Sequence, residues 1–225
     1  MSHGWKVKDM PSDKSSDASP QPAVKMPLLV VGIGASAGGL DAVGELLKNI
    51  PDDTCMAFIF VQHLAPDHNS LLTEILSKKT AMLVTEAKEG VRVEANRVYI
   101  IPPNATMTIV RGCLDLEPRN DSFGIPTPID DLFHSLAEDQ GPRAIGISLS
   151  GTGADGALGM RSIKDEGGIT FAQDKKSAQY SSMPDAAVEL GCVDFILPPP
   201  EIARELVRIS RAALQAGKLA HDAKD

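Results

Sequence analysis

Short apolar runs alternate with amphipathic segments along most of this chain, and this alternation restricts its fold more than any other feature. The runs PLLVVGIG, MAFIFVQ, RAIGISLSG and GITFAQD have the length and continuity of strands that are buried on both faces. Segments with a helical apolar period lie between them; Leu40, Val43 and Leu47 share one face of the first. The pattern predicts an α/β fold, in which a doubly wound, mainly parallel sheet is covered by helices on both faces.

A different pattern interrupts this alternation in the middle of the chain. RVYIIPP and TMTIVRGCLDLEP alternate apolar and polar residues like hairpin strands, around Pro102–Pro103 and Arg111–Gly112. The next helix opens at TPIDDLF, where Thr127 suits the cap position and Asp130 completes a capping box. We therefore expect a β-hairpin inserted into a three-layer sandwich.

The two ends of the chain differ from the rest. Residues 1–26 are rich in Ser, Asp, Lys and Pro and show no apolar period, which predicts a disordered leader or linker. One ordered domain is expected over residues 27–217. Residues 218–225 are expected to form a disordered tail.

The composition excludes several classes of function. The formal net charge is −8, so no general electrostatic attraction to nucleic acid or anionic lipid is expected. No apolar run has the length of a membrane span, and the N-terminus lacks the apolar centre of a signal peptide. Neither a disulfide framework nor a zinc site follows from the widely spaced Cys55, Cys113 and Cys192. We expect a cytoplasmic protein without membrane insertion.

The stretch VVGIGASAGGLDAV, residues 30–43, matches two motifs at once. Its glycines and Ala37 spell G-x-G-x-x-[GA], the dinucleotide-binding fingerprint, whereas Gly34, Ser36 and Gly38 spell G-x-S-x-G, a turn that presents a nucleophilic serine. A dinucleotide site also requires an acidic residue at the end of the second strand, and that strand ends in FVQHLAP. The stretch therefore favours a nucleophile, with a dinucleotide-binding oxidoreductase as the weaker alternative.

Three residues of the types found in a catalytic triad follow three of the predicted strands. Ser36 follows the first strand, His63 follows the second, and Asp155 follows the strand that ends in LSGTGADG. A serine needs a base within hydrogen-bond reach, and the histidine needs a carboxylate that fixes its tautomer. We expect the three side chains to meet at one edge of the sheet. Backbone N–H groups near Ala37 and Thr152 are the expected oxyanion donors.

Each triad residue also has an ordinary structural interpretation. Ser36 could cap the following helix, His63 could bond to a carbonyl at the strand end, and Asp155 could cap the helix after the glycine-rich turn. The combination of the three residue types at three strand ends favours catalysis. His68 forms a poor metal pair with His63, and His134 lies inside a predicted helix.

The motifs GIGASAGG, VQHLAPDH and LSGTGADG, in this order, resemble the catalytic domain of chemotaxis protein-glutamate methylesterases of the CheB type. The likeness covers residues 27–216. In that family the Ser, His and Asp of these motifs form the triad, which implies this role for Ser36, His63 and Asp155. The resemblance implies hydrolysis of glutamate γ-methyl esters on the cytoplasmic helices of a chemoreceptor, with release of methanol. It also implies glutamine deamidation by the same path, without a metal or an organic cofactor.

Two features depart from the family pattern. Many members have Thr where this chain has Ala37 and Met where it has Thr152, so packing around the oxyanion site is expected to differ. Regulated members also carry an N-terminal receiver domain, which residues 1–26 cannot form. The residues of the three motifs resemble those of members fused to a methyltransferase. The implied partners are a methylated chemoreceptor or related signalling protein and a methyltransferase, and the alternative is a receptor-docking module without catalysis.

Overall fold

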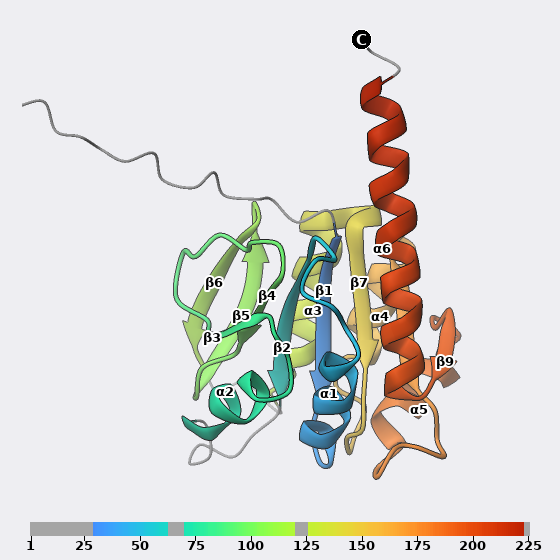
Figure 1. Ribbon diagram of the computed structural model, residues 1–225. Coiled ribbons are helices and arrows are strands. Elements are labelled where there is room, and N and C mark those ends of the chain that lie inside the picture. Colours follow the sequence, from blue (N-terminus) through green and yellow to red (C-terminus); the bar gives the residue numbers. More distant parts are fainter. Residues whose placement is uncertain (1–28, 63–69, 120–125, 223–225) are drawn as a thin grey trace, which may run out of the picture.

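A seven-stranded sheet forms the centre of the computed structural model, which describes residues 29–62, 70–119 and 126–222. The strand order is β3-β4-β2-β1-β7-β8-β9, and every neighbouring pair is parallel (Figure 1). This arrangement confirms the predicted parallel α/β sheet. The strands are β1 (Leu29–Ala35), β2 (Met56–Gln62), β3 (Leu83–Glu86), β4 (Arg97–Ile100), β7 (Ala144–Ser148), β8 (Ile169–Gln173) and β9 (Phe195–Leu197).

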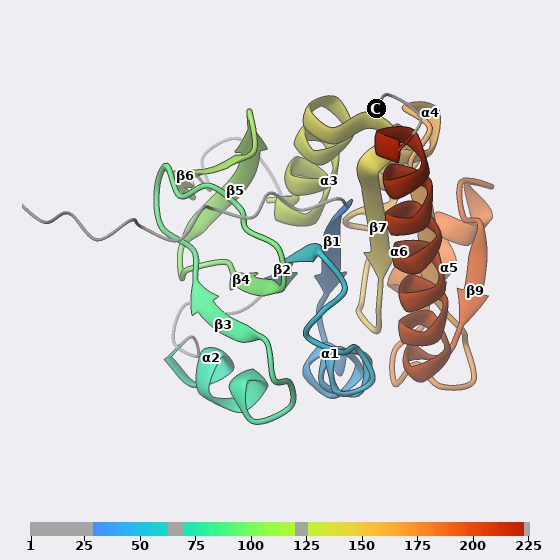
Figure 2. The ribbon, with the colours of Figure 1, turned by 45° about the horizontal axis from the view of Figure 1, so that its top comes forward.

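Helices cover both faces of this sheet, as the alternating pattern predicted (Figure 2). One face carries α1 (Gly39–Lys48), α2 (Ser70–Ser77) and α6 (Pro199–Asp222). The other face carries α3 (Pro128–Gln140), α4 (Ala157–Asp165) and α5 (Ser182–Glu189).

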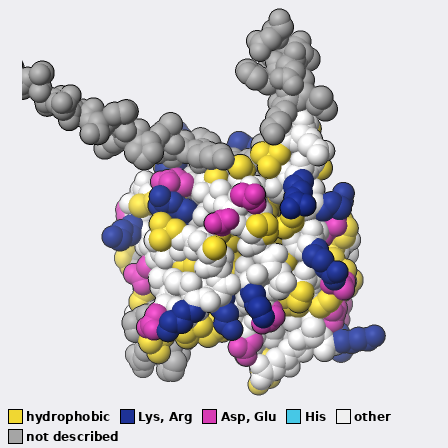
Figure 3. Space-filling model, in the orientation of Figure 1, with side chains coloured by type: hydrophobic (Ala, Val, Ile, Leu, Met, Phe, Trp, Pro, Cys, Tyr) yellow, Lys and Arg dark blue, Asp and Glu magenta, His cyan; other side chains and the backbone are white. Residues whose placement is uncertain are grey.

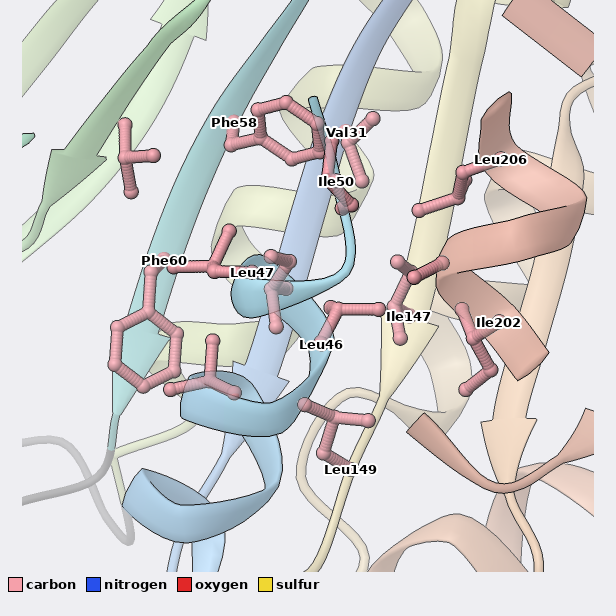
Figure 4. Close-up of a cluster of buried hydrophobic side chains, with 14 of the residues drawn as sticks. Val31, Leu46, Leu47, Ile50, Phe58, Phe60, Ile147, Leu149, Ile202 and Leu206 are labelled. Atoms are coloured by element: carbon pink, nitrogen blue, oxygen red, sulfur yellow. The ribbon is translucent and has the colours of Figure 1, made fainter. Parts of the chain in front are cut away.

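The buried side chains form two separate cores, one on each face of the sheet. Val31 and Ile33 of β1 belong to the core under α1 and α6, whereas Val30 belongs to the core under α3. The period of two along the strand produces this division, because successive side chains point to opposite faces. Figure 4 shows Leu46 of α1 and Leu206 of α6 packed over the sheet in the first core.

The expected hairpin is present, but one of its predicted strands belongs elsewhere. β5 (Ala105–Val110) and β6 (Cys113–Pro118) pair antiparallel around Arg111 and Gly112, whose φ angles of 53° and 72° suit a tight hairpin turn. β4 was predicted as a hairpin strand around Pro102–Pro103, and this prediction is wrong. It lies between β2 and β3 in the main sheet because its apolar residues are buried on both faces.

The C-terminal boundary also differs from the prediction. A disordered tail was expected over residues 218–225, but α6 stays helical to Asp222. Ala, Leu and Lys in this segment are strong helix formers, and they outweigh the cost of about 1 kcal/mol for Gly217 in the helix. The predicted leader over residues 1–26 lies outside the described residues.

Two surface properties bear on possible partners. No described helix combines the length and apolar content needed to cross a lipid bilayer. Lys and Arg side chains are interspersed with Asp and Glu on the face seen in Figure 3, so this face presents no broad patch of a single sign.

The sheet order locates the position where a site is expected. The chain passes from β1 to β2 on one side and returns later to place β7 on the other side of β1. In sheets of this type, ligands bind beyond the carboxyl ends of the strands where the order reverses. That position lies at the lower end of β1 and β7 in Figure 1, on the edge opposite to the C-terminal end of α6.

Candidate active site

Ser36 lies in a tight turn between β1 and α1 that only small residues can form. Gly38 has a φ of 71°, and a Cβ added there would lie 2.6 Å from Oε1 of Gln179. A Cβ on Gly39 would lie 2.4 Å from that of Ala35. The Gly39 N–H donates to the Ser36 carbonyl at 2.9 Å, which closes the turn. The two glycines thus allow the chain to turn sharply directly after the serine.

The Ser36 side chain is not the cap of α1. Gly38 occupies the N-cap position, and no side chain forms a capping hydrogen bond there. The capping interpretation of this serine is therefore wrong. Its hydroxyl stays available for another role at the carboxyl end of β1.

The first glycines of the motif serve helix packing. Gly32 and Gly34 lie within β1, before the turn. A Cβ on Gly34 would lie 2.3 Å from Cγ2 of Ile129, and one on Gly32 would lie 2.9 Å from Cδ2 of Leu136, both on α3. A dinucleotide fingerprint places its glycines in the turn, where the backbone approaches the pyrophosphate. The geometry therefore does not fit the dinucleotide alternative.

The loop after β7 packs directly against Ser36. A Cβ on Gly151 would lie 3.0 Å from the Ser36 Cβ and 2.7 Å from Sδ of Met183, which is buried. The Ser36 N–H donates to the Ser150 carbonyl at 3.0 Å. The Ser150 hydroxyl donates to the Ala37 carbonyl at 2.8 Å and accepts from the Tyr180 N–H at 3.0 Å. This buried serine was not singled out from the sequence, because its partners lie far away along the chain.

Asp155 belongs to the same loop, and its carboxylate caps α3. Its Oδ1 accepts the N–H of Asp130 at 3.0 Å, and its Oδ2 accepts the N–H of Ile129 at 3.2 Å. The prediction that it could cap α4 is wrong, since Gly156 holds that position without a side-chain hydrogen bond. The positive end of the α3 dipole favours a carboxylate at this place.

The predicted capping box at the start of α3 is absent. Thr127 occupies the N-cap position but forms no side-chain capping bond. Asp130 instead turns its Oδ1 toward α4 and accepts the Gly159 N–H at 2.8 Å. Asp155 supplies the cap that the local sequence had assigned to Thr127.

Burial controls the electrostatics around Asp155. Desolvation raises the pKa of Asp155 to about 6, opposed by the two backbone N–H donors and reinforced by the charges of Asp130 and Asp131. Burial and the Asp130 charge also raise the pKa of Asp131. A cation beside Asp155 would relieve part of the cost of ionising it.

The end of β2 reaches the Ser36 turn from the other side. Gln62 is the register partner of Ala35, and its Nε2 donates to the Ser36 carbonyl at 3.3 Å. Its Oε1 is buried without a hydrogen-bond partner in the described part of the chain. His63, the predicted base, follows Gln62 directly but lies outside the described residues, as does His68. The structure thus brings Ser36, Gln62 and Gly151 together.

The expected oxyanion donors belong to the Ser36 turn, which contains Ala37, and to the loop after β7, which contains Thr152. Within the described ranges, neither the Ala37 N–H nor the Thr152 N–H donates a hydrogen bond. Thr152 is exposed, and Ala37 is half-buried. No acceptor in the described part of the chain therefore occupies either N–H group.

The other candidate side chains of the described segments lie partly on the surface and partly in the core. Nδ1 of His134 lies 2.7 Å from the Ser162 hydroxyl, where an exposed link joins α3 and α4. Cys55, Cys113 and Cys192 are free thiols. In the described segments, no three His, Cys, Asp or Glu side chains are grouped so that they could hold a metal ion.

Several named proteins are similar to this chain in sequence. The family model described as CheB methylesterase matches residues 31–206. "Protein-glutamate methylesterase/protein-glutamine glutaminase 2" of Anaeromyxobacter dehalogenans is 38% identical over 87% of this chain and 57% of its own length. "Protein-glutamate methylesterase FrzG" of Myxococcus xanthus is 34% identical over 88% of this chain and 58% of its own length. The chain therefore spans somewhat more than half the length of these curated relatives.

A solved structure supports the same relationship. The CheB methylesterase catalytic domain of Thermotoga maritima superposes with a TM-score of 0.73 and 27% identity, covering 80% of this chain and 98% of that domain. The family model matches most of this chain, and the solved domain has the same fold. On these grounds the chain belongs to the CheB methylesterase family.

Proposed function

We propose that this chain hydrolyses γ-methyl esters of glutamate in a methylated signalling protein and releases methanol. The observation that carries the proposal is the position of the Ser36 turn, which the end of β2 and the loop after β7 contact from opposite sides. This is the switch point of the sheet, where catalytic groups gather in folds of this class. The names of the relatives give the ester as the substrate class.

In the proposed reaction, the Ser36 hydroxyl attacks the ester carbonyl while His63 takes its proton. The N–H groups of Ala37 and Thr152 stabilise the oxyanion of the tetrahedral intermediate. His63 then protonates the departing methoxide, which leaves as methanol, and a glutamyl ester of Ser36 remains. A water molecule, deprotonated by His63, attacks this ester and forms a second tetrahedral intermediate. When this intermediate collapses, the bond to the Ser36 oxygen breaks, His63 returns the proton to that oxygen, and a glutamate carboxylate is released.

In this scheme Asp155 orients the His63 imidazole and stabilises the imidazolium that forms. Its two bonds to the first turn of α3 hold the carboxylate rigidly, and its other lone pairs stay available to an imidazole N–H. Burial raises the pKa of Asp155 to about 6, and a neighbouring imidazolium would favour its ionised form.

The same groups can deamidate a glutamine side chain. The carbonyl of an amide is attacked in the same way, and His63 then protonates the departing amide nitrogen, which leaves as ammonia in place of methanol. The name of the Anaeromyxobacter relative includes a glutaminase. We propose deamidation as a second activity of the Ser36 site.

The proposed partner is a chemoreceptor or a related methylated signalling protein, modified on its cytoplasmic helices. A methyltransferase, free or fused, would supply the ester. The remaining alternative is a module that binds the methylated segment without cleaving it. Turnover distinguishes the two, because a docking module leaves the ester intact.

The test is the release of methanol from a chemoreceptor fragment whose glutamates carry labelled methyl esters. We expect the wild-type chain to move the label into the volatile fraction, and Ser36→Ala to lower the rate at least about 10³-fold without loss of folding. Ser162→Ala is the matched control, since this serine also contacts a histidine but lies on the α3–α4 surface. Equal rates for wild type and Ser36→Ala would refute the assignment of the nucleophile.

A further inference from the structure

A cavity of about 800 Å³ opens beside Asp155, between the starts of α3 and α4 and the end of α5. Thr152 and Asp155 line it, so it is continuous with the candidate active site. A segment bound with its ester at Ser36 therefore has this cavity within reach of its neighbouring residues.

The wall of the cavity contains apolar side chains that the fold itself does not bury. Leu158 of α4 is 58% exposed and Leu190, after α5, is 36% exposed, and both line the cavity together with Ala157 and Ala186. The neighbours of Leu158 that face the core, such as Met160, are fully buried. Two exposed leucines that face one cavity are typical of a surface that contacts another molecule.

The charged side chains that line the cavity are all acidic. Asp130, Asp155 and Glu189 line it, Asp131 lies on the same turn of α3 as Asp130, and no Lys or Arg of the described segments belongs to the lining. Arg161, the nearest basic side chain on α4, is bonded to the Leu190 carbonyl. A carboxylate or phosphate would be repelled here, whereas an apolar or basic group would be accepted.

We propose that this cavity is the subsite that selects the substrate segment, and that it takes an apolar side chain near the modified glutamate. The acidic groups exclude segments that carry Asp or Glu at this place. The inference rests on the proposed function, because the occupant is a part of the protein whose ester lies at Ser36. Leu158 and Leu190 supply the contact area, and Glu189 supplies the discrimination against acids.

The first experiment changes the enzyme. Leu158→Ala is compared with Leu83→Ala, because Leu83 is similarly exposed at 53% but lies on the edge strand β3. We expect Leu158→Ala to raise the KM for the methylated protein about ten-fold with kcat nearly unchanged, as the loss of a contact shared by ground state and transition state predicts. Leu83→Ala should leave both constants at the wild-type values. Leu190→Ala provides a second variant of the same wall.

The second experiment changes the substrate. Methyl-esterified peptides carry Leu or Asp at each position within one helical turn of the modified glutamate. We expect the wild-type chain to prefer Leu over Asp by about 100-fold at one position at least, and Glu189→Lys to reduce this preference several-fold. Glu166→Lys, an exposed acid just beyond α4, is the charge-matched control and should not change the preference.

The outcomes separate the subsite from the reaction. Peptide affinity, measured by fluorescence anisotropy, tests the subsite even if no methanol appears; a wild-type chain that releases none refutes the proposed function alone. If Leu158→Ala and Leu190→Ala bind and turn over the peptides like Leu83→Ala, the subsite is refuted. The subsite is also refuted if the wild-type chain binds and hydrolyses the Leu and Asp peptides equally well at every position.

Discussion

Ser36 and Asp155 follow neighbouring strands at the same edge of the sheet, yet different parts of the chain hold them in place. Ser36 is positioned by the residues next to it, since Gly38 and Gly39 form the turn that exposes it. Asp155 is positioned by the first turn of α3, which precedes it by 25 residues. A local turn can be recognised from a motif, whereas a contact between two loops depends on how the helices pack.

The difference has an energetic consequence. The carboxylate of Asp155 replaces the missing cap of α3, so one side chain supports both a helix end and the proposed triad. Ser36 has no comparable structural duty, because α1 begins without a side-chain cap. Substitutions of Asp155 should therefore affect both activity and stability, whereas substitutions of Ser36 should affect activity alone.

The largest expected effect is on the rate. Asp155→Asn should lower kcat for methyl-ester hydrolysis about 10³- to 10⁴-fold, because an amide cannot stabilise the imidazolium and favours the wrong tautomer. The chain should still fold, since one amide oxygen can accept a bond from α3. Steady-state kinetics on the methylated chemoreceptor fragment measures this loss. Asp131→Asn, in the turn of α3 that Asp155 caps, is the control, and its kcat should stay within a few-fold of the wild-type value.

A smaller effect is expected where β1 packs against α3. Gly34→Ala should destabilise the fold by about 2–3 kcal/mol, because the added Cβ would lie 2.3 Å from Cγ2 of Ile129. Gly44→Ala should be neutral or stabilising by up to about 1 kcal/mol, since a Cβ there meets Lys79 only at 3.7 Å. Urea unfolding gives both values.

A double-mutant cycle sharpens this prediction. Ile129→Ala removes the atom that the new Cβ would strike. The cost of Gly34→Ala should therefore fall in the Ile129→Ala background. Equal costs in the two backgrounds would mean that the glycine has another purpose, which would reopen its interpretation as part of a ligand-binding turn.

The smallest expected effect is the dependence of stability on pH. The folded pKa of Asp155, about 6, lies above its ordinary value of 3.8, so the folded chain binds this proton more tightly than the unfolded chain does. The resulting stabilisation is complete below about pH 4 and is lost as the pH rises through 6. With allowance for partial exposure, it amounts to about 1–2 kcal/mol.

Asp155→Asn should abolish this dependence. The free energy of unfolding of the wild type minus that of the variant should decrease between pH 4 and 7, as followed by urea unfolding at a series of pH values. A difference that stays constant or increases with pH would contradict the raised pKa. It would then follow that the α3 amides, alone or together with the imidazole of the proposed triad, outweigh burial at this carboxylate.

Much of the fold and half of the candidate site were predictable from local patterns. The apolar runs indicated strands buried on both faces, and the small residues after the first strand indicated a turn that exposes Ser36. Both predictions depend on residues within a few positions of each other. The direction of β4 was not predictable in this way, because an apolar strand of four residues can pair with either kind of neighbour.

The sequence by itself determined the parallel α/β architecture, the family motifs and the tight turn that carries Ser36, because periodicity and turn chemistry act over short stretches of chain. Only the tertiary structure decided that Gly32 and Gly34 admit α3, that Asp155 caps α3, and that two exposed leucines share a cavity with the site. Each of these facts is a contact between elements that are distant in sequence. Such contacts follow from the packing of the helices on the sheet, which no single stretch of residues specifies.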